Sequence, residues 1–221
     1  RASATLYQKA GVKFAILGSE EKCTGDLARR SGNEMLFQML AGENVETMNN
    51  YKIKKIVTAC PHCLNSIKNE YPQLGGEYEV FHHSQFIAKL VDEGRLPVKS
   101  NLKDTITYHD PCYLGRYNKE YEAPRNLLKH AADEPMREMK RHGSESFCCG
   151  GGGARMWMEE TIGTRINENR TEEAISTGAS TVATGCPFCM TMLSDGITAK
   201  GKSESMQVKD VAELVLEAVE A

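Results

Sequence analysis

The sequence predicts an α/β protein made of two tandem copies of one unit, each with a parallel sheet flanked by helices. Short apolar runs alternate along the chain with longer segments of helical periodicity, the order typical of parallel strands joined by helices. An offset of 126 residues superposes three cysteines of the first half on three of the second: Cys23, Cys60 and Cys63 on Cys149, Cys186 and Cys189. Ten of the 42 positions over residues 23–64 match their counterparts, which indicates a duplication.

The first copy begins within a helix and contains three predicted strands. The predicted elements are a helix over 2–8, a buried strand over 11–18, helical spacing over 25–50, strands over 54–59 and 79–81, and a helix with Ser84 as N-cap. At the offset of 126, Cys112 would have its counterpart before Arg1, and the first residue is not Met. We therefore expect this chain to be a C-terminal piece whose upstream part holds the opening strand of the first copy.

The second copy repeats the same order of elements. The predicted elements are strands over 105–108 and 181–184, and helices over 120–133, 154–177, 187–197 and 211–220, the last with Asp210 as N-cap. A stretch with glycine and proline over 94–101 reads as the linker. The sequence thus predicts a truncated first repeat over residues 1–97 and a complete second repeat over 98–221.

The composition is that of an ordinary globular protein. The chain has 221 residues, 40% of them hydrophobic, and its 27 basic and 30 acidic residues give a formal net charge of −3. This charge and a pI near 6.1 exclude the basic footprint typical of nucleic-acid binding. No apolar run approaches the ~20 residues that span a bilayer, so we expect membrane contact only through upstream segments.

Eight cysteines are the unusual feature. Disulfide frameworks are typical of short secreted chains that cannot build a core, whereas this chain is long and opens with no signal peptide. The cysteines therefore indicate metal binding or redox chemistry.

Each cysteine motif of the second copy falls where a predicted strand ends or a predicted helix begins. These positions collect at one edge of a parallel sheet. The spacing is Cys-x35-Cys-Cys-x36-Cys-x2-Cys, which provides five thiolates. Zinc closes its structural sites with four ligands, while a cluster with several irons can use all five.

Three motifs of the second copy resemble the cysteine-rich CCG domain: HDPCYLGR at residues 109–116, FCCGGGG at 147–153 and GCPFC at 185–189. This family includes catalytic subunits of heterodisulfide reductases. It also includes iron–sulfur subunits of anaerobic glycerol-3-phosphate, lactate and glycolate dehydrogenases, and electron-transfer-flavoprotein:quinone oxidoreductases. The resemblance covers the whole chain as two tandem copies.

The resemblance implies a [4Fe-4S] cluster in the second copy, with a non-cubane form among those known in the family. The implied ligands are five cysteines: Cys112, Cys148, Cys149, Cys186 and Cys189. It implies an oxidoreductase subunit, with no catalytic side chain assigned, that passes electrons from a flavoprotein dehydrogenase, an electron-transfer flavoprotein or ferredoxin-type cluster domains to a quinone or a disulfide. The implied location is the cytoplasm, at the cytoplasmic face of the inner membrane as part of a larger subunit.

The first copy departs from the family motif, because Cys23 stands alone where the motif has two adjacent cysteines. A second metal site of Cys23, Cys60 and Cys63 therefore has three open outcomes. It is a zinc site completed by His62, His82 or His83, a degraded cluster, or a relic without metal.

Other functions fit parts of the sequence. A disulfide-cleaving catalytic site would need a pocket over the loop that carries Cys148 and Cys149, lined by Arg116 or Arg155. The C-x-x-C motif at residues 60–63 is also similar to the active site of thiol–disulfide oxidoreductases, although that function uses no other cysteine of the chain. A structural protein with zinc in both copies is the remaining alternative.

Overall fold

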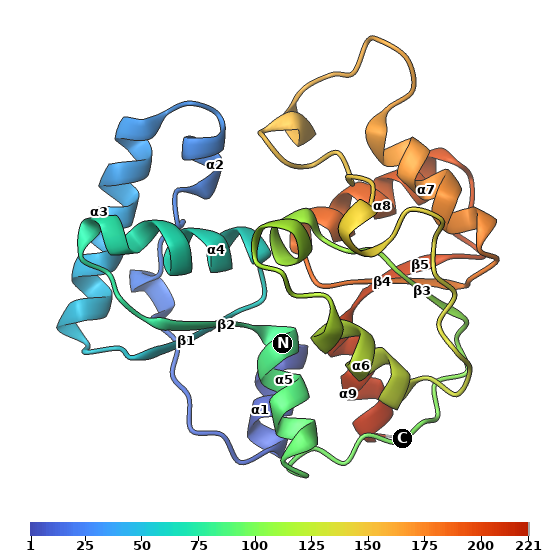
Figure 1. Ribbon diagram of the computed structural model, residues 1–221, viewed down its shortest axis with the longest axis horizontal. Helices are drawn as coiled ribbons and strands as arrows, with labels where there is room; N and C mark the ends of the chain where they lie inside the picture. The colour runs from blue at the N-terminus through green and yellow to red at the C-terminus, as the bar shows by residue number, and fades with distance from the viewer. Residues whose placement is uncertain (221) are drawn as a thin grey trace.

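The computed structural model describes residues 1–220 and shows two α/β halves packed against each other (Figure 1). The helices and strands are α1 (Ala2–Lys9), α2 (Asp26–Arg30), α3 (Glu34–Asn50), β1 (Lys55–Thr58), α4 (Pro61–Asn65), β2 (Glu79–His82), α5 (His83–Asp92), β3 (Ile106–Tyr108), α6 (Glu122–Ala131), α7 (Ile166–Ser176), β4 (Thr181–Thr184), α8 (Pro187–Ala199), β5 (Gln207–Asp210) and α9 (Val211–Glu220). Among these helices, none is both long enough and apolar enough to cross a bilayer.

Both halves contain a parallel sheet. β1 pairs with β2, and in the second half β4 lies between β3 and β5. β1 and β4 are superposed by the offset of 126 residues, so the β1–β2 pair corresponds to the β4–β5 pair. All four residues of β4 are buried, as expected for a central parallel strand. The predicted fold class, with parallel sheets flanked by helices in tandem units, is confirmed.

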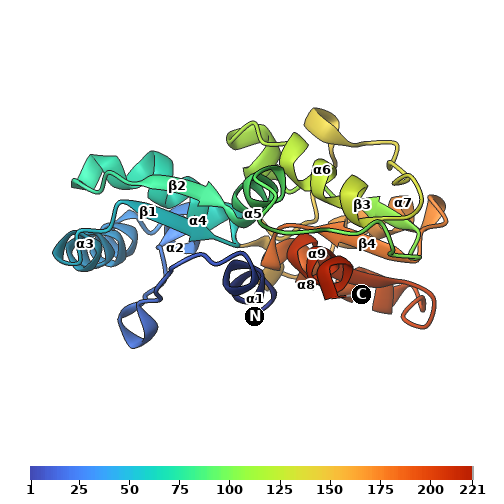
Figure 2. The same cartoon turned by 90° about the horizontal axis from the view of Figure 1, so that it is seen from below.

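Helices from both halves share one apolar core. Leu6 of α1 and Leu90 of α5 belong to the same cluster of buried side chains as Leu128 of α6 and Val215 of α9. Figure 2 shows α1, α5 and α9 side by side where the halves meet. Burial of one such side chain contributes about 1.5–3 kcal/mol, so this core holds the two halves together.

Residues 11–18 do not form a strand. They follow α1 as an irregular segment in which Ile16 is 79% exposed and Phe14 is 43% exposed. A strand needs a neighbour that pairs with its backbone N–H and C=O groups, and no described strand pairs with this segment. The prediction of a buried strand here is wrong.

Two predicted helices are interrupted by glycines in the left-handed region. Within residues 25–50, Gly32 has a φ of 90° and separates α2 from α3. Within residues 154–177, Gly163 has a φ of 70°, and the α-helix begins only at Ile166. A left-handed residue ends a right-handed helix, so both predicted helices were too long.

The predicted N-caps were right for α9 and wrong for α5. The Asp210 Oδ1 atom accepts a hydrogen bond from the Ala212 N–H at 2.8 Å. In α5 the N-cap is His82 rather than Ser84, and Gln85 Oε1 accepts from the His82 N–H at 3.0 Å to complete a capping box. The other predicted elements lie within two residues of their expected bounds. The division at residue 97 stays a prediction.

Candidate metal centre

The five cysteines of the second half lie at the carboxyl edge of its sheet. Cys112 follows β3, and Cys186 follows β4 as the N-cap of α8, with Cys189 in the first turn of that helix. Cys148 and Cys149 lie in the loop that precedes α7. Parallel strands bring their carboxyl ends to one edge, which is why residues so distant in sequence meet here.

The thiols of these cysteines form a continuous row of hydrogen-bonded neighbours. The order along the row is Cys112, Cys148, Cys149, Cys189, Cys186. Three of the five residues are buried, while Cys112 and Cys148 are partly exposed. All are free thiols. The structure thus brings together every ligand that the sequence analysis proposed for the second half.

The glycines after Cys149 allow the backbone to approach the sulfurs closely. The Gly150 N–H donates to the Cys148 Sγ at 3.2 Å. A Cβ atom at Gly151 would lie 3.2 Å from the Met192 side chain and 3.6 Å from the Cys149 Sγ. A larger residue would therefore crowd the row, and the glycine run has a structural reason.

The row continues into the first half through Cys60 and Cys63. The Cys60 thiol is hydrogen-bonded to both Cys186 and Cys63. Because Cys60 and Cys186 are equivalent positions of the duplication, the two C-x-x-C motifs face each other about an approximate two-fold axis. In Figure 1, α4 and α8, which begin at these motifs, lie on either side of the centre of the molecule. The sequence analysis did not predict this meeting of the two motifs.

Cys23 lies at the edge of this arrangement and is exposed. Its Sγ accepts the Gly25 N–H at 3.4 Å, and the contact from this segment to the Cys63 Sγ comes from Thr24 Oγ1 at 3.5 Å. The histidines considered as fourth zinc ligands have other partners: His62 Nδ1 bonds Asp26, His82 bonds Ser84 and Gly185, and His83 Nδ1 bonds Ser3. A second site of Cys23, Cys60 and Cys63 stays a prediction.

Hydrogen bonds within the row give the thiols unlike pKa values. The hydrogen bonds from Cys112 and Cys149 lower the pKa of Cys148 to about 2. Burial raises the pKa of Cys186, but hydrogen bonds from its neighbours outweigh burial and the net shift is downward. The pKa of Cys149 is raised to about 12, first by its hydrogen bond to Cys148. Negative charge therefore concentrates on Cys148 and Cys186, and the thiolate is the form that binds metal.

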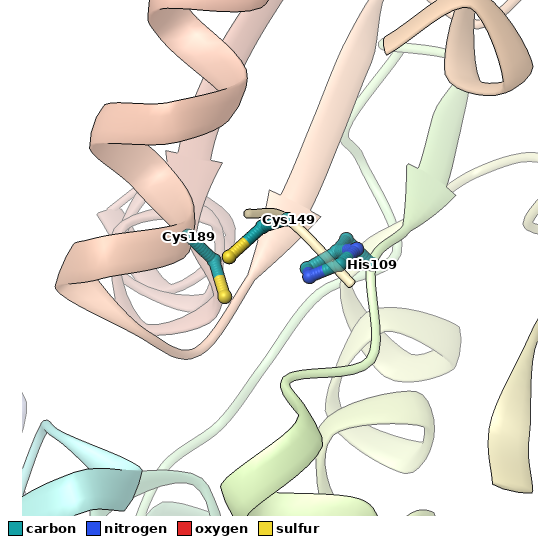
Figure 3. A group of neighbouring side chains, drawn as sticks. All are labelled: His109, Cys149 and Cys189. Atoms are coloured by element: carbon teal, nitrogen blue, oxygen red, sulfur yellow. The ribbon is translucent and has the colours of Figure 1, made fainter. Parts of the chain in front are cut away.

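His109 lies against the middle of the row. A nitrogen of its ring and the Sγ atoms of Cys149 and Cys189 all lie within 4.8 Å of one another (Figure 3). The residue is 1% exposed, and its Nδ1 accepts a hydrogen bond from Arg170 Nε at 3.0 Å. Burial, and then the charge of Arg170, lowers the pKa of His109 to about 3, so the ring is neutral at physiological pH.

Arg170 is a residue of this site that the sequence analysis missed. It is fully buried in α7 and also donates to Glu173 Oε2 at 2.9 Å. The signal in the sequence was an arginine on the buried stripe of a helix. The other members of that stripe are Asn167, Thr171 and Ala174.

A chain of aromatic rings runs past the two C-x-x-C motifs, with His62 of the first half between rings of the second half. Ring centroids lie 6.3 Å apart for Trp157 and Phe188, 5.0 Å for Phe188 and His62, and 4.1 Å for His62 and Tyr113. Tyr113 stacks in turn on Tyr117 at 4.4 Å. His62 and Phe188 are equivalent positions of the duplication, so the pair lies close to the approximate two-fold axis.

The donor set of the second half fits an iron–sulfur cluster. Five thiols are one more than a closed zinc site takes, and several irons can use all of them. The first turn of α8 begins at Cys186, so the positive end of this 13-residue helix favours negative charge on the sulfurs. Backbone N–H groups such as that of Gly150 add hydrogen bonds of the kind that tune a cluster.

Comparison with known proteins agrees with this chemistry. A family model described as CCG, cysteine-rich domain, matches residues 1–68 and 106–194. The chain is 49% identical over 216 residues to the probable iron-sulfur-binding oxidoreductase FadF of Bacillus subtilis, covering 98% of this chain and 31% of that protein. It is 47% identical over 222 residues to the EtfAB:quinone oxidoreductase of Syntrophomonas wolfei, covering 97% and 31%.

A third relative is a subunit of a heterodisulfide reductase. The chain is 37% identical over 225 residues to one of the subunits of the dihydromethanophenazine:CoB--CoM heterodisulfide reductase of Methanosarcina barkeri, covering 99% of this chain and 54% of that relative. The chain therefore spans about a third of the first two relatives and about half of the third.

Proposed function

The chain belongs to the CCG cysteine-rich domain family, and we propose that its second half holds a [4Fe-4S] cluster that relays electrons. An electron-transfer role within an iron–sulfur oxidoreductase follows from the family and its named relatives. The proposed ligands are the five thiols of the row: Cys112, Cys148, Cys149, Cys186 and Cys189. The bound cluster would supply one-electron transfer, and its form, cubane or non-cubane, is a question for spectroscopy.

The observation that carries this proposal is the thiol row itself. Three segments far apart in sequence place five free thiols in contact, and three of them are buried. Burying a thiolate in an apolar setting is costly unless it is paired with a cation. The lowered pKa values of Cys148 and Cys186 support this proposal, because the thiolate is the form that binds metal.

The surroundings of the row favour electron relay over a reaction at the cluster. Arg116 Nη1 donates to the Ser146 carbonyl, and Arg155 forms an ion pair with Glu160. The charge of Arg155 is thus paired with a carboxylate, and one nitrogen of Arg116 is used by the backbone. Trp157 and Met158 lie exposed in the loop beyond the glycine run, which is the kind of apolar surface where proteins dock.

We propose that the electron donor is an electron-transfer flavoprotein, a flavoprotein dehydrogenase or a ferredoxin-type cluster domain, and that the acceptor is a quinone. The printed name of the Syntrophomonas relative, EtfAB:quinone oxidoreductase, supports this choice. A quinone takes up two electrons and two protons, and a one-electron centre delivers the electrons singly. Because quinones dissolve in membranes, the proposed place of this chain is the cytoplasmic face of the inner membrane, within a larger subunit.

Cleavage of a disulfide at the cluster is the second candidate, and the name of the Methanosarcina relative favours it. Two electrons and two protons would convert one disulfide into two thiols. Addition of a quinone analogue or of a disulfide to the reduced protein distinguishes the two functions. Reoxidation by the quinone alone supports relay, and reoxidation by the disulfide with release of two thiols supports cleavage.

The primary test is metal and sulfide analysis of anaerobically prepared protein together with EPR. We expect about four irons and four sulfides per chain and a cluster spectrum after one-electron reduction. Zinc without iron would end the cluster proposal. Zinc or additional iron beyond one cluster would indicate a second site of Cys23, Cys60 and Cys63.

Serine variants test the ligand set. Replacement of Cys149, buried in the middle of the row, is expected to abolish or reshape the EPR spectrum and to lower the iron content. The matched control is Cys23→Ser, because Cys23 is exposed at the edge of the arrangement. An unchanged spectrum for Cys149→Ser would remove this residue from the proposed ligands.

A further inference from the structure

We infer that His109 is a hydrogen-bond donor to the sulfurs of the proposed cluster, not a metal ligand, and that Arg170 fixes it in this role. Judged by distance alone, His109, Cys149 and Cys189 form a three-residue group that could hold a metal ion, since their ligand atoms lie within 4.8 Å of one another. The hydrogen bonds of the histidine decide otherwise. This inference rests on the proposed cluster for its consequence, but its geometry does not depend on a cluster.

The first step concerns the tautomer of His109. A guanidinium group has N–H donors and no acceptor. The Arg170 Nε–H points at His109 Nδ1 at 3.0 Å, so Nδ1 must carry a lone pair. The proton of the neutral ring is then on Nε2, and Nε2 has no lone pair left for a metal ion.

The second step concerns rigidity. The His109 N–H donates to the Ala183 carbonyl at 2.9 Å, and Thr184 Oγ1 donates to the His109 carbonyl at 3.3 Å. Both partners belong to β4, which ends immediately before the loop to Cys186. These two hydrogen bonds fix the backbone of His109 to β4, the strand that leads to the C-x-x-C motif. The imidazole is therefore held beside the thiol row.

The third step concerns Arg170, which is held from three sides. Its Nη1 donates to the Arg141 carbonyl and to Glu173 Oε2, both at 2.9 Å, and its Nη2 lies 3.5 Å from Ser146 Oγ. The side chain is fully buried. A buried arginine with this many partners cannot swing away, so it keeps His109 in one tautomer with Nε2–H as the free donor.

The chemical consequence is a shift in reduction potential. An N–H donor beside cysteine sulfur stabilises negative charge on it, and the reduced cluster carries one more electron than the oxidised cluster. The donor therefore favours reduction. His109 would donate this hydrogen bond itself. Arg170 acts through His109 and is therefore the positioning residue.

The first test uses the metal-free protein and nitrogen-15 NMR of the histidine rings. We expect His109 with a proton on Nε2 and an unprotonated Nδ1. A ring protonated on Nδ1 would overturn the inference. Arg170→Gln removes the guanidinium that donates to Nδ1, so we expect this variant to show a mixture of the two His109 tautomers. Because buried arginines are costly to remove, the spectrum of the unaltered protein carries the decision.

The second test is a redox titration of the cluster in three variants. Asparagine at position 109 can accept from Arg170 at the place of Nδ1 but is too short to reach the sulfurs, whereas glutamine places an N–H near the position of Nε2. We expect His109→Asn to lower the ratio of reduced to oxidised cluster, at a fixed potential, by roughly 3- to 10-fold, the effect of one hydrogen bond. His109→Gln is expected to recover most of this loss.

Arg141→Gln is the control for a general disturbance of these ion pairs, because Arg141 shares Glu173 with Arg170, whereas the bond to His109 comes from Arg170. The reduction potential of the cluster in this variant should equal that in the parent protein. Equal potentials for the parent, His109→Asn and His109→Gln would overturn the inference. A protein with no iron would instead refute the proposed cluster, while the tautomer of His109 in the metal-free protein could still be read.

Discussion

At the scale of single residues, neighbouring cysteines of the thiol row differ in their pKa values. Cys148 and Cys186 accept hydrogen bonds from the cysteines on both sides and have lowered pKa values, whereas Cys149 and Cys189 have raised ones. Two thiolates spaced along the row are repelled less than adjacent ones would be. In the proposed site, the metal-free protein would thus hold two thiolates, and the other thiols would lose their protons as metal binds.

The charge on Cys148 predicts an unusual alkylation profile for the metal-free protein. Its pKa of about 2 makes it a thiolate throughout the range from pH 5 to 8. We expect its rate of reaction with iodoacetamide, followed by peptide mass spectrometry, to be nearly independent of pH there. The rate for an ordinary thiol rises about tenfold per unit over much of this range.

The matched variant is Cys112→Ala, which removes one hydrogen-bond donor to Cys148. In this variant the pKa of Cys148 should rise and its alkylation should become slower at pH 5 than at pH 8. A tenfold rise per pH unit in the parent protein would contradict the thiolate assignment.

At the scale of elements, the turn from β2 into α5 joins the two halves through one side chain. His82 caps α5 through Nδ1, and its Nε2 bonds the Gly185 carbonyl of the second half at 2.9 Å. Gly185 leaves room for this ring, since a Cβ there would lie 2.9 Å from the His82 ring. One histidine therefore serves as a helix cap and as a contact between the halves.

This histidine predicts a pH dependence of stability. Burial lowers the pKa of His82 to about 4 from 6.5, so between these pH values the unfolded chain binds a proton that the folded protein does not. The free energy of unfolding must then fall as the pH falls from 6.5 to 4, by about 3 kcal/mol from this group. His82→Asn keeps a capping side chain and lacks this titration.

We expect His82→Asn to be less stable than the parent at pH 7, and the difference in the free energy of urea unfolding to shrink as the pH falls to 4. Asp210, whose pKa is raised to about 7 mainly by burial, acts in the opposite direction. Its contribution is the same in both proteins and cancels in the comparison. The control is His130→Asn, an exposed histidine of α6. A difference that stays constant with pH would refute the prediction.

The elements also show what the sequence can and cannot predict. β1, β3 and β4 were predicted because each is a segment rich in β-branched residues that ends at a cysteine motif or a few residues before one. β5 was missed because three of its four residues, Gln207–Asp210, are polar: one is uncharged and two are charged. Its strand character comes from pairing with β4. Residues 11–18 have the composition of a strand, but no described strand pairs with them. Pairing is a property of the tertiary structure, and local pattern does not contain it.

The same limit applies to the site. The five cysteines could be proposed from their spacing and from the resemblance to a family. The contacts of Cys60 with Cys186, and of His109 with Arg170, join residues 126 and 61 positions apart. These contacts depend on how the two halves and α7 pack. The sequence therefore did not predict which residues contact each other here.

At the scale of the whole molecule, the duplication has become one structure with a shared centre. The approximate two-fold axis passes between Cys60 and Cys186 and between His62 and Phe188. The shared apolar core contains side chains from α1, α5, α6 and α9. The two halves are therefore held together by the core and by the cysteine motifs, and we expect them to unfold as a unit.

A core residue of the first half tests this expectation with a probe in the second. Leu90 of α5 is 1% exposed in the shared core, and Leu90→Ala should lower the free energy of unfolding by about 2–5 kcal/mol. Trp157, the single tryptophan, reports on the second half because its ring packs on Phe188 at 6.3 Å. If the halves unfold together, its fluorescence transition in urea shifts with the far-UV circular dichroism transition by the same amount. The control is Lys89→Ala on the exposed side of the same helix, with an expected change within about 0.5 kcal/mol. A dichroism transition that splits in two, with the Trp157 transition unmoved, would show that the second half keeps its fold without the first.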